Sequence, residues 1–312
     1  MRAKLFIALG ALTVLAGAVP SKGTAFSITE TAPSAAQRSM PQPVRLRVNR
    51  QSGLLVTAWL NGSGPYVFAI DTGAGMNLVS QRVVSEARLS VRNVRPTLVG
   101  GLTGATTSSN READFKELSL GDRSNIFRGK SALVVSGLAQ AVDGILDPTD
   151  VYSPYGYSID LPNQRLEPIS RATGVQAQPQ GEGAVVPWLR LGGSMRPFVR
   201  LGDGRLALID TGSGFGLAVN ERNAVIVGGP RGRRNQTPET NHDLGGGIIN
   251  SRRVAPTTIS IGELVLRGVP TDILFGAEDN APLILGRDAL YPFKITFDPQ
   301  KRLISFVTSE RS

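Results

Sequence analysis

The sequence predicts an all-β fold of two similar lobes related by a pseudo-two-fold axis, with a few short helices. The first observation is a repeated motif, because Ile70-Asp71-Thr72-Gly73 recurs as Ile209-Asp210-Thr211-Gly212 at an offset of 210 − 71 = 139 residues. The second is that Ile145-Leu146 recurs as Ile284-Leu285 at the same offset. The third is a run of short apolar segments among 36 glycines and 20 prolines, as all-β chains require. A repeat of domain size indicates a duplication and not a solenoid.

Composition excludes several kinds of chemistry. The 312 residues suit two domains at about 150 residues each. The chain has no cysteine, which excludes disulfides, thiol catalysis and thiolate metal sites. His242 is the only histidine and lies in the polar stretch Thr240–Asp243, which is typical of a solvated loop. We find no metal-ligand cluster and expect neither a metal nor a cofactor.

The chain is strongly basic, with a formal net charge of +9 and a pI near 10.3. Such a charge can favour anionic partners. No nucleic-acid motif accompanies it, and aromatic residues make up only 6% of the chain. We therefore interpret the charge as a surface property and expect no nucleic-acid partner.

The N-terminus resembles a secretory signal peptide over residues 1–25. A basic start, Met1–Lys4, precedes the apolar run Leu5–Leu15. Ala16-Gly17-Ala18 offers one cleavage site and Gly23-Thr24-Ala25 a second. The run is short for a membrane span of about 20 residues. We expect export to the periplasm or outside the cell, with membrane contact only if the segment is retained. Residues 26–43 have the composition of a flexible leader.

Residues 44–169 form the first predicted lobe. Leu54–Leu60 and Tyr66–Ile70 are extended runs around the turn Asn61–Gly64, which indicates a hairpin. Ser80 to Arg88 is predicted as a short helix with Ser80 as its N-cap. A glycine-rich segment, Leu98–Gly104, lies between β-prone runs and can form the tip of a hairpin.

The second lobe repeats these features over residues 185–312, after a linker at residues 170–184. Gly202-Asp203-Gly204 gives a second hairpin turn before the second Asp-Thr-Gly. Leu244–Ile249 is the corresponding glycine-rich hairpin candidate, and Gly228–Arg234 has the composition of a mobile basic loop.

Two lobes about a pseudo-two-fold axis would bring Asp71 and Asp210 face to face. Two carboxylates so close cannot both ionise cheaply, so they share a proton and titrate as a unit. The pair can supply a general base and a general acid together, with a water attacking a peptide carbonyl and no covalent intermediate.

The threonine and glycine that follow each aspartate can also be explained physically. Gly73 and Gly212 relieve crowding at a sharp turn, and the hydroxyls of Thr72 and Thr211 can satisfy backbone groups across the interface.

Residues 45–307 resemble the aspartic proteases, specifically the retropepsin-like branch found in bacteria, duplicated within one chain. The resemblance is carried by Ala69–Ala74, by Leu208–Ser213, and by the hydrophobic-hydrophobic-Gly-Arg-Asp element Leu283–Asp288. It implies retropepsin- or pepsin-like lobes, Asp71 and Asp210 as the catalytic pair, and threonines that lock the lobes. It also implies a peptide or protein substrate, a monomer that acts as an intrachain pseudo-dimer, and a flap that closes over substrate. The flap tip would comprise Gly100, Gly101, Leu102, Thr103 and Gly104.

The chain departs from that pattern at two positions. Asp147 stands where the second repeat has Gly286, and could disturb the first lobe or leave a third carboxylate near the site. Gly75 replaces the acidic residue usual in retroviral members. These departures leave open a non-catalytic peptide- or protein-binding module on the same fold. Separately, each unit could pair with another chain, but the matched repeats favour pairing within one chain, which needs no partner. We expect an aspartic endopeptidase, because both motifs are intact.

Overall fold

A computed structural model describes residues 40–49, 52–100, 106–138, 142–170, 174–176, 178–179, 181–191, 194–227, 239–242 and 248–311. The chain from Met40 onward forms one compact unit, and all that follows concerns its described part. The predicted signal peptide and most of the predicted leader lie outside the described residues.

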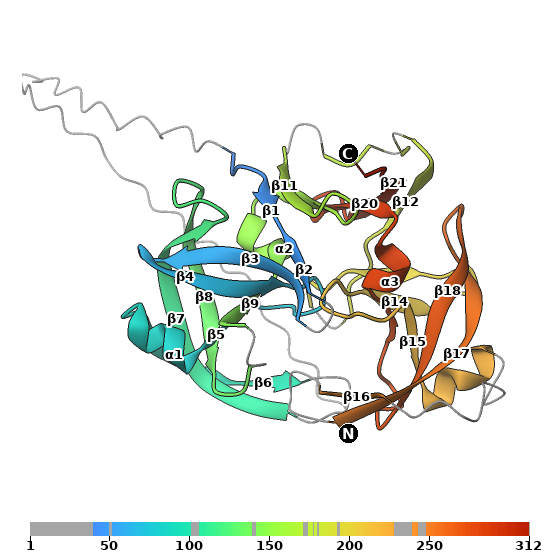
Figure 1. The fold of residues 1–312 in the computed structure, drawn as a ribbon, viewed down its shortest axis with the longest axis horizontal. Helices are drawn as coiled ribbons and strands as arrows, with labels where there is room; N and C mark the ends of the chain where they lie inside the picture. Colours follow the sequence, from blue (N-terminus) through green and yellow to red (C-terminus); the bar gives the residue numbers. More distant parts are fainter. Residues whose placement is uncertain are drawn as a thin grey trace, which may run out of the picture. The chain divides into compact units, whose positions relative to one another are not determined.

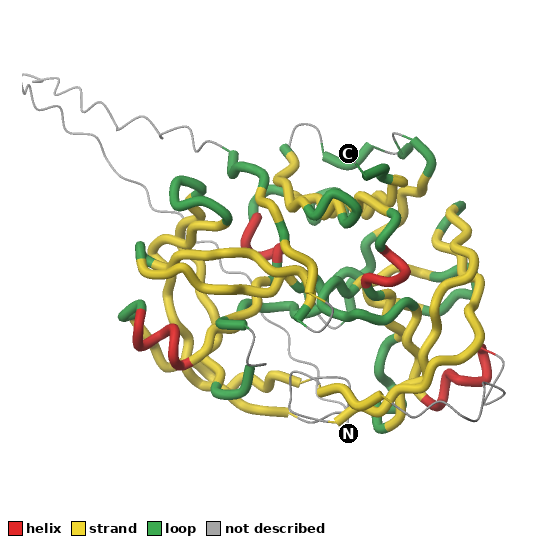
Figure 2. Tube along the Cα trace, viewed as in Figure 1, coloured by secondary structure: helices red, strands yellow, loops and turns green. Residues whose placement is uncertain are grey.

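Strands are the main element of the described part, with loops between them and few helices, which confirms the predicted all-β fold (Figure 2). One sheet holds, in spatial order, β2 (Arg47–Asn49), β3 (Gly53–Leu60), β4 (Ser63–Ile70), β9 (Gly144–Leu146), β5 (Leu78–Ser80), β8 (Ile126–Val135), β7 (Thr106–Leu120) and β6 (Ser90–Gly100). A second holds β13 (Phe198–Arg200), β14 (Leu206–Ile209), β19 (Leu283–Leu285), β15 (Leu217–Asn220), β18 (Leu264–Phe275), β17 (Ile248–Ile261) and β16 (Glu239–His242). A third holds β1 (Val44–Arg45), β11 (Arg165–Ile169), β10 (Gly156–Asp160), β20 (Phe293–Asp298), β21 (Leu303–Thr308) and β12 (Gly183–Pro187).

The first two sheets repeat one topology. In the first, β4 pairs parallel with β9, β9 antiparallel with β5, and β5 parallel with β8. In the second, β14, β19, β15 and β18 follow in the same order with the same directions. The register agrees too, because Ile70 opposes Leu146 just as Ile209 opposes Leu285. In Figure 1 the strands β3, β4 and β8 lie on one side and β15, β17 and β18 on the other. The repeat in the sequence is therefore a repeat in the fold.

Hairpins lead into both Asp-Thr-Gly loops, as the turn residues predict. β3 and β4 pair antiparallel, and Asn61 and Gly62 between them have φ of 50° and 83°. Positive φ at two successive residues is what a tight hairpin turn requires, and asparagine and glycine accept it most readily. β13 and β14 pair antiparallel in the second repeat around the turn predicted at Gly202-Asp203-Gly204.

The third sheet takes strands from both repeats and joins them (Figure 1). β10 pairs antiparallel with β20, which sets Tyr157 opposite Phe297. Their rings stack with centroids 4.8 Å apart, and both side chains are fully buried. The strand β12 begins at Gly183, within the segment predicted as a linker. Backbone hydrogen bonds and a shared aromatic core therefore hold the two repeats together.

Helices are few and short in the described part. α1 (Gln81–Glu86) begins after Ser80, whose hydroxyl accepts a hydrogen bond from the amide of Val83 at 3.3 Å, as predicted. The others are α2 (Pro148–Tyr152), α3 (Arg287–Leu290) and the 3-10 helix η1 (Glu221–Val227). None of the described helices is long and apolar enough to cross a membrane.

One prediction near His242 is wrong. Of the stretch Thr240–Asp243, expected as a loop, the residues up to His242 belong to β16 and pair antiparallel with β17. β16 lies at the edge of its sheet, where one side of the backbone is unpaired and polar residues are common. Gly228–Arg234 and most of the glycine-rich candidate Leu244–Ile249 lie outside the described residues.

Candidate active site

The two Asp-Thr-Gly loops follow β4 and β14, the corresponding strands of the two repeats. Each loop is anchored alike at its start. The amide of Asp71 donates to the carbonyl of Leu146 at 3.0 Å, and the amide of Asp210 donates to that of Leu285 at 2.9 Å. Because these carbonyls belong to the neighbouring parallel strands β9 and β19, the sheets themselves place the aspartates.

The structure brings Asp71 and Asp210 together. A Cβ atom at Gly73 would lie 2.8 Å from Cγ of Asp210, and one at Gly212 would lie 2.5 Å from Cγ of Asp71. Each glycine thus lies against the carboxyl group of the other repeat, and the two carboxyl groups hydrogen-bond to each other. Oδ1 of Asp71 accepts from the amide of Gly73 at 2.7 Å, and Oδ1 of Asp210 accepts from that of Ser213 at 3.0 Å.

Burial and mutual repulsion shift the titration of this pair. Burial, followed by the nearby charge of Asp210, raises the pKa of Asp71 well above its usual range. Burial also raises the pKa of Asp210, but the hydrogen bond with Asp71, backbone amides and Arg287 oppose that rise. The pair therefore retains one proton to a higher pH than either isolated carboxyl group would.

The threonines cross the interface between the two loops with matched hydrogen bonds. Oγ1 of Thr72 donates to the carbonyl of Ile209 at 2.7 Å and accepts from the amide of Thr211 at 3.0 Å. In return, Oγ1 of Thr211 accepts from the amide of Thr72 at 3.2 Å and donates to the carbonyl of Ile70 at 3.4 Å. Both threonines are fully buried. They hold the aspartates in register across the interface.

Asp147 lies directly after Leu146, beneath the first loop. Its side chain is 2% exposed and accepts from the amide of Thr149 at 2.8 Å, which caps α2. Burial is the largest cause that raises the pKa of Asp147 to about 7. A third carboxyl group therefore adjoins the pair, while β9 and α2 both form around it.

Gly286 takes the corresponding place in the second repeat. A Cβ there would lie 2.4 Å from the carbonyl oxygen of Phe215, so the second lobe has no room for a side chain.

Arg287 is a functional candidate that we had not singled out from the sequence. Its Nη1 atom donates to the carbonyls of Thr211 at 2.9 Å and Gly212 at 2.7 Å, directly beneath the second loop. The residue is 7% exposed, and its charge acts on Asp210. The signal was present in the Gly-Arg-Asp element, which the first repeat lacks because Pro148 stands there.

A cavity of about 520 Å³ opens beside the first loop. Its lining mixes apolar and charged side chains and includes Asp147. The residues around it are Gly75, Met76, Asn77, Val94, Arg95, Thr97, Glu112, Ser131, Ala132, Leu133, Asp147, Thr149, Asp150, Ser153 and Met195. Met195 comes from the second repeat, and no sequence signal indicated it.

The predicted flap corresponds to the hairpin of β6 and β7. These strands pair antiparallel up to Gly100, which opposes Thr106. Gly101, Leu102, Thr103 and Gly104 lie outside the described residues.

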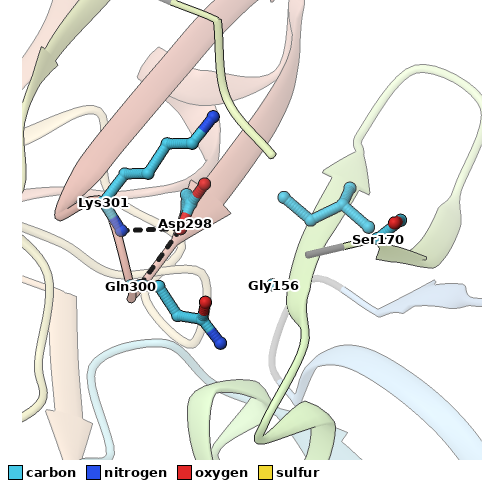
Figure 3. Close-up of a pocket in the computed structure, with 6 residues that line it drawn as sticks. Gly156, Ser170, Asp298, Gln300 and Lys301 are labelled. Atoms are coloured by element: carbon cyan, nitrogen blue, oxygen red, sulfur yellow. Dashed lines mark hydrogen bonds between the residues drawn. The ribbon is translucent and has the colours of Figure 1, made fainter. Parts of the chain in front are cut away.

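The described residues contain no group of three or more histidine, cysteine, aspartate or glutamate side chains that could hold a metal ion. A second cavity, of about 30 Å³, lies where β10 and β11 meet the turn after β20 (Figure 3). Its Asp298 accepts from the amides of Gln300 at 3.0 Å and Lys301 at 2.9 Å. This volume holds about one water molecule, so the cavity is too small for a substrate.

Comparison with known proteins agrees with this geometry. A family model described as aspartyl protease matches residues 56–146, which include the first Asp-Thr-Gly loop, β9 and the first hairpins. No curated protein matches the chain. The match supports an aspartyl protease family, and so a protease in general, for the first repeat. The second repeat carries the same topology and the same loop.

Proposed function

We propose that this protein is an aspartic endopeptidase that hydrolyses peptide bonds with a water activated between Asp71 and Asp210. The observation that carries the proposal is the contact of the buried carboxyl group of Asp71 with the half-buried one of Asp210 across a symmetric interface. Two matched carboxyl groups with raised pKa values form an acid–base pair that can act near neutral or acidic pH.

The chemistry needs one carboxyl group protonated and the other ionised. The ionised group removes a proton from the water, whose oxygen attacks the peptide carbonyl carbon. The protonated group gives its proton to the carbonyl oxygen. A tetrahedral diol results, and its collapse with proton transfer to the leaving nitrogen breaks the C–N bond.

The surroundings of the pair suit a peptide. The β6–β7 hairpin offers a flap over an extended chain, and the cavity at Gly75 and Met76 offers room for a side chain of that chain. We further propose that one chain suffices as a monomer, since both loops belong to it. Export, to the periplasm or outside the cell, remains our proposal from residues 1–25, and we propose no nucleic-acid partner.

Digestion of a denatured protein by the full chain tests the proposal. Asp71→Asn and Asp210→Asn each remove one member of the pair with little change of shape, and each should abolish cleavage. Asp298→Asn is the matched control, because Asp298 is a buried carboxylate outside both loops, held by the amides of Gln300 and Lys301. Cleavage that survives in either variant would contradict the proposal. A folded wild-type chain that cuts nothing would favour the non-catalytic binding module.

A further inference from the structure

The two aspartates have nearly identical loops but different charges beneath them. At the position after each buried leucine, the first repeat has Asp147 and the second has Gly286. One residue later, the first repeat has Pro148 and the second has Arg287. The two loops are therefore symmetric, but the residues that pack next to them are not.

On the first side, the added group is a carboxyl group that becomes negatively charged as the pH rises through its pKa of about 7. Asp147 follows the leucine whose carbonyl accepts from the amide of Asp71, and it is almost fully buried. Asp147 accepts from the amide of Thr149, and Oγ1 of Thr149 lies 3.1 Å from the hydroxyl of Tyr157. When Asp147 is ionised, its charge disfavours ionisation of Asp71.

On the second side, the added charge is positive. The guanidinium of Arg287 is bound to the two carbonyls that directly follow Asp210 in the chain. An arginine remains charged at every relevant pH, so it favours ionisation of Asp210. Solvent exposure also favours ionisation of Asp210 over Asp71, since Asp71 is buried and Asp210 is half-buried.

We infer that Asp147 and Arg287 are positioning residues that place the shared proton on Asp71. Asp71 is then the general acid, which protonates the peptide carbonyl oxygen. Asp210 is the general base, which accepts the proton of the attacking water. These roles rest on the proposed function, but the position of the proton does not depend on catalysis.

Other ionisable groups around the pair do not reverse this bias. Burial, together with the charges of Asp147 and Asp71, raises the pKa of Tyr157 on β10, so this side chain stays neutral. Asp150 adds negative charge on the side of Asp147, and Asp288 lies near Arg287. Burial is the largest cause that raises the pKa of both aspartates. For Asp210 the hydrogen bond with Asp71 and the charge of Arg287 oppose that rise, whereas for Asp71 the charges of Asp210 and Asp147 add to it, which agrees with the inference.

The experiment is a ¹³C NMR titration of aspartate side-chain carboxyl groups in the full chain. In Asp71→Asn the remaining partner is Asp210, and in Asp210→Asn it is Asp71. Comparison with the double variant assigns each resonance. We expect Asp210 to titrate at least about one pH unit below Asp71, a tenfold difference in the ionisation constant. No proteolysis is measured, so this result does not depend on the success of the proposed function.

Second-site variants identify the cause. Asp147→Asn keeps a capping side chain but removes the charge, and it should lower the pKa measured for Asp71. Arg287→Gln should raise the pKa measured for Asp210, whereas Arg287→Lys keeps the charge and should leave that pKa unchanged. Asp298→Asn should change neither pKa. Equal titration of the two aspartates, or no response to Asp147→Asn and Arg287→Gln, would overturn the inference. An equal effect of Arg287→Lys and Arg287→Gln would show that Arg287 acts only through its hydrogen bonds, and would overturn its part.

Discussion

Gly212 lies against the carboxyl group of Asp71, so closely that a Cβ at position 212 would sit 2.5 Å from Cγ of that aspartate. Gly73 stands in the same relation to Asp210, at 2.8 Å. Each glycine of the two motifs thus leaves space for the aspartate of the other repeat. The Asp-Thr-Gly triplet therefore allows the two carboxyl groups to come into contact.

Gly212→Ala should therefore impair catalysis while the chain stays folded. The added methyl group would displace Asp71, and a displacement of about 1 Å can lower a rate by about 100-fold. We expect kcat/KM on a cleaved peptide to fall at least that far. Gly137→Ala is the matched control, since a Cβ there meets nothing within 4 Å. Equal activity of both variants would contradict the geometry described.

Thr72→Val should destabilise the interface between the repeats. The variant keeps the shape but leaves the carbonyl of Ile209 and the amide of Thr211 without their partner in a fully buried place. Each unsatisfied group costs about 1–3 kcal/mol. We expect the free energy of unfolding, measured by chemical denaturation, to fall by about 2–6 kcal/mol. Thr72→Ser, which retains the hydroxyl, should lose much less, and a similar loss in both would contradict this account.

Asp147 should make the stability of the protein depend on pH. Its pKa of about 7 lies above the usual value of 3.8, so between these values the folded state holds a proton that the unfolded state has lost. Stability contributed by this group is therefore complete below about pH 4 and declines as the pH rises to about 7. The loss can reach about 4 kcal/mol, at 1.36 kcal/mol for each pH unit.

Asp147→Asn isolates this effect, because asparagine carries no charge and still caps a helix. Chemical denaturation should show the variant close to wild type at about pH 4 and more stable than wild type at about pH 8. A difference between the two proteins that does not change with pH would contradict the assigned role of Asp147.

Peptide cleavage should have a bell-shaped dependence on pH. Activity requires the pair to hold one proton, so it should fall when both carboxyl groups are protonated and again when both are ionised. Burial raises both pKa values, which should place the optimum above the range of ordinary carboxyl groups. A profile of kcat/KM against pH measures this directly. A rate that rises steadily through alkaline pH would point to a different base.

Much of the fold could be predicted from the sequence because its signals are local. The hairpin at Asn61 and Gly62 follows from turn chemistry, and the pairing of Asp71 with Asp210 follows from the repeat. The shared sheet could not be predicted, since the pairing of β10 with β20 joins residues far apart in the chain. No local sequence pattern predicts that Tyr157 stacks on Phe297.

The site was predicted as symmetric, and the departure of Asp147 from the pattern was visible. The burial of Asp147 beneath the first loop could not be predicted, because it depends on the packing of β9 and α2. Arg287 was seen only as part of a motif. Its contact with the second loop depends on α3 following β19, which is a property of the folded sheet.

The most direct measurement is the digestion of an unbiased peptide library by the full chain, read by mass spectrometry, over a series from about pH 3 to 8. Wild type and Asp71→Asn are compared at each pH. We expect internal cleavage by the wild type, greatest within a limited pH range, and none by the variant. Cleavage by both proteins at the same bonds would contradict the claim that Asp71 and Asp210 form the catalytic pair.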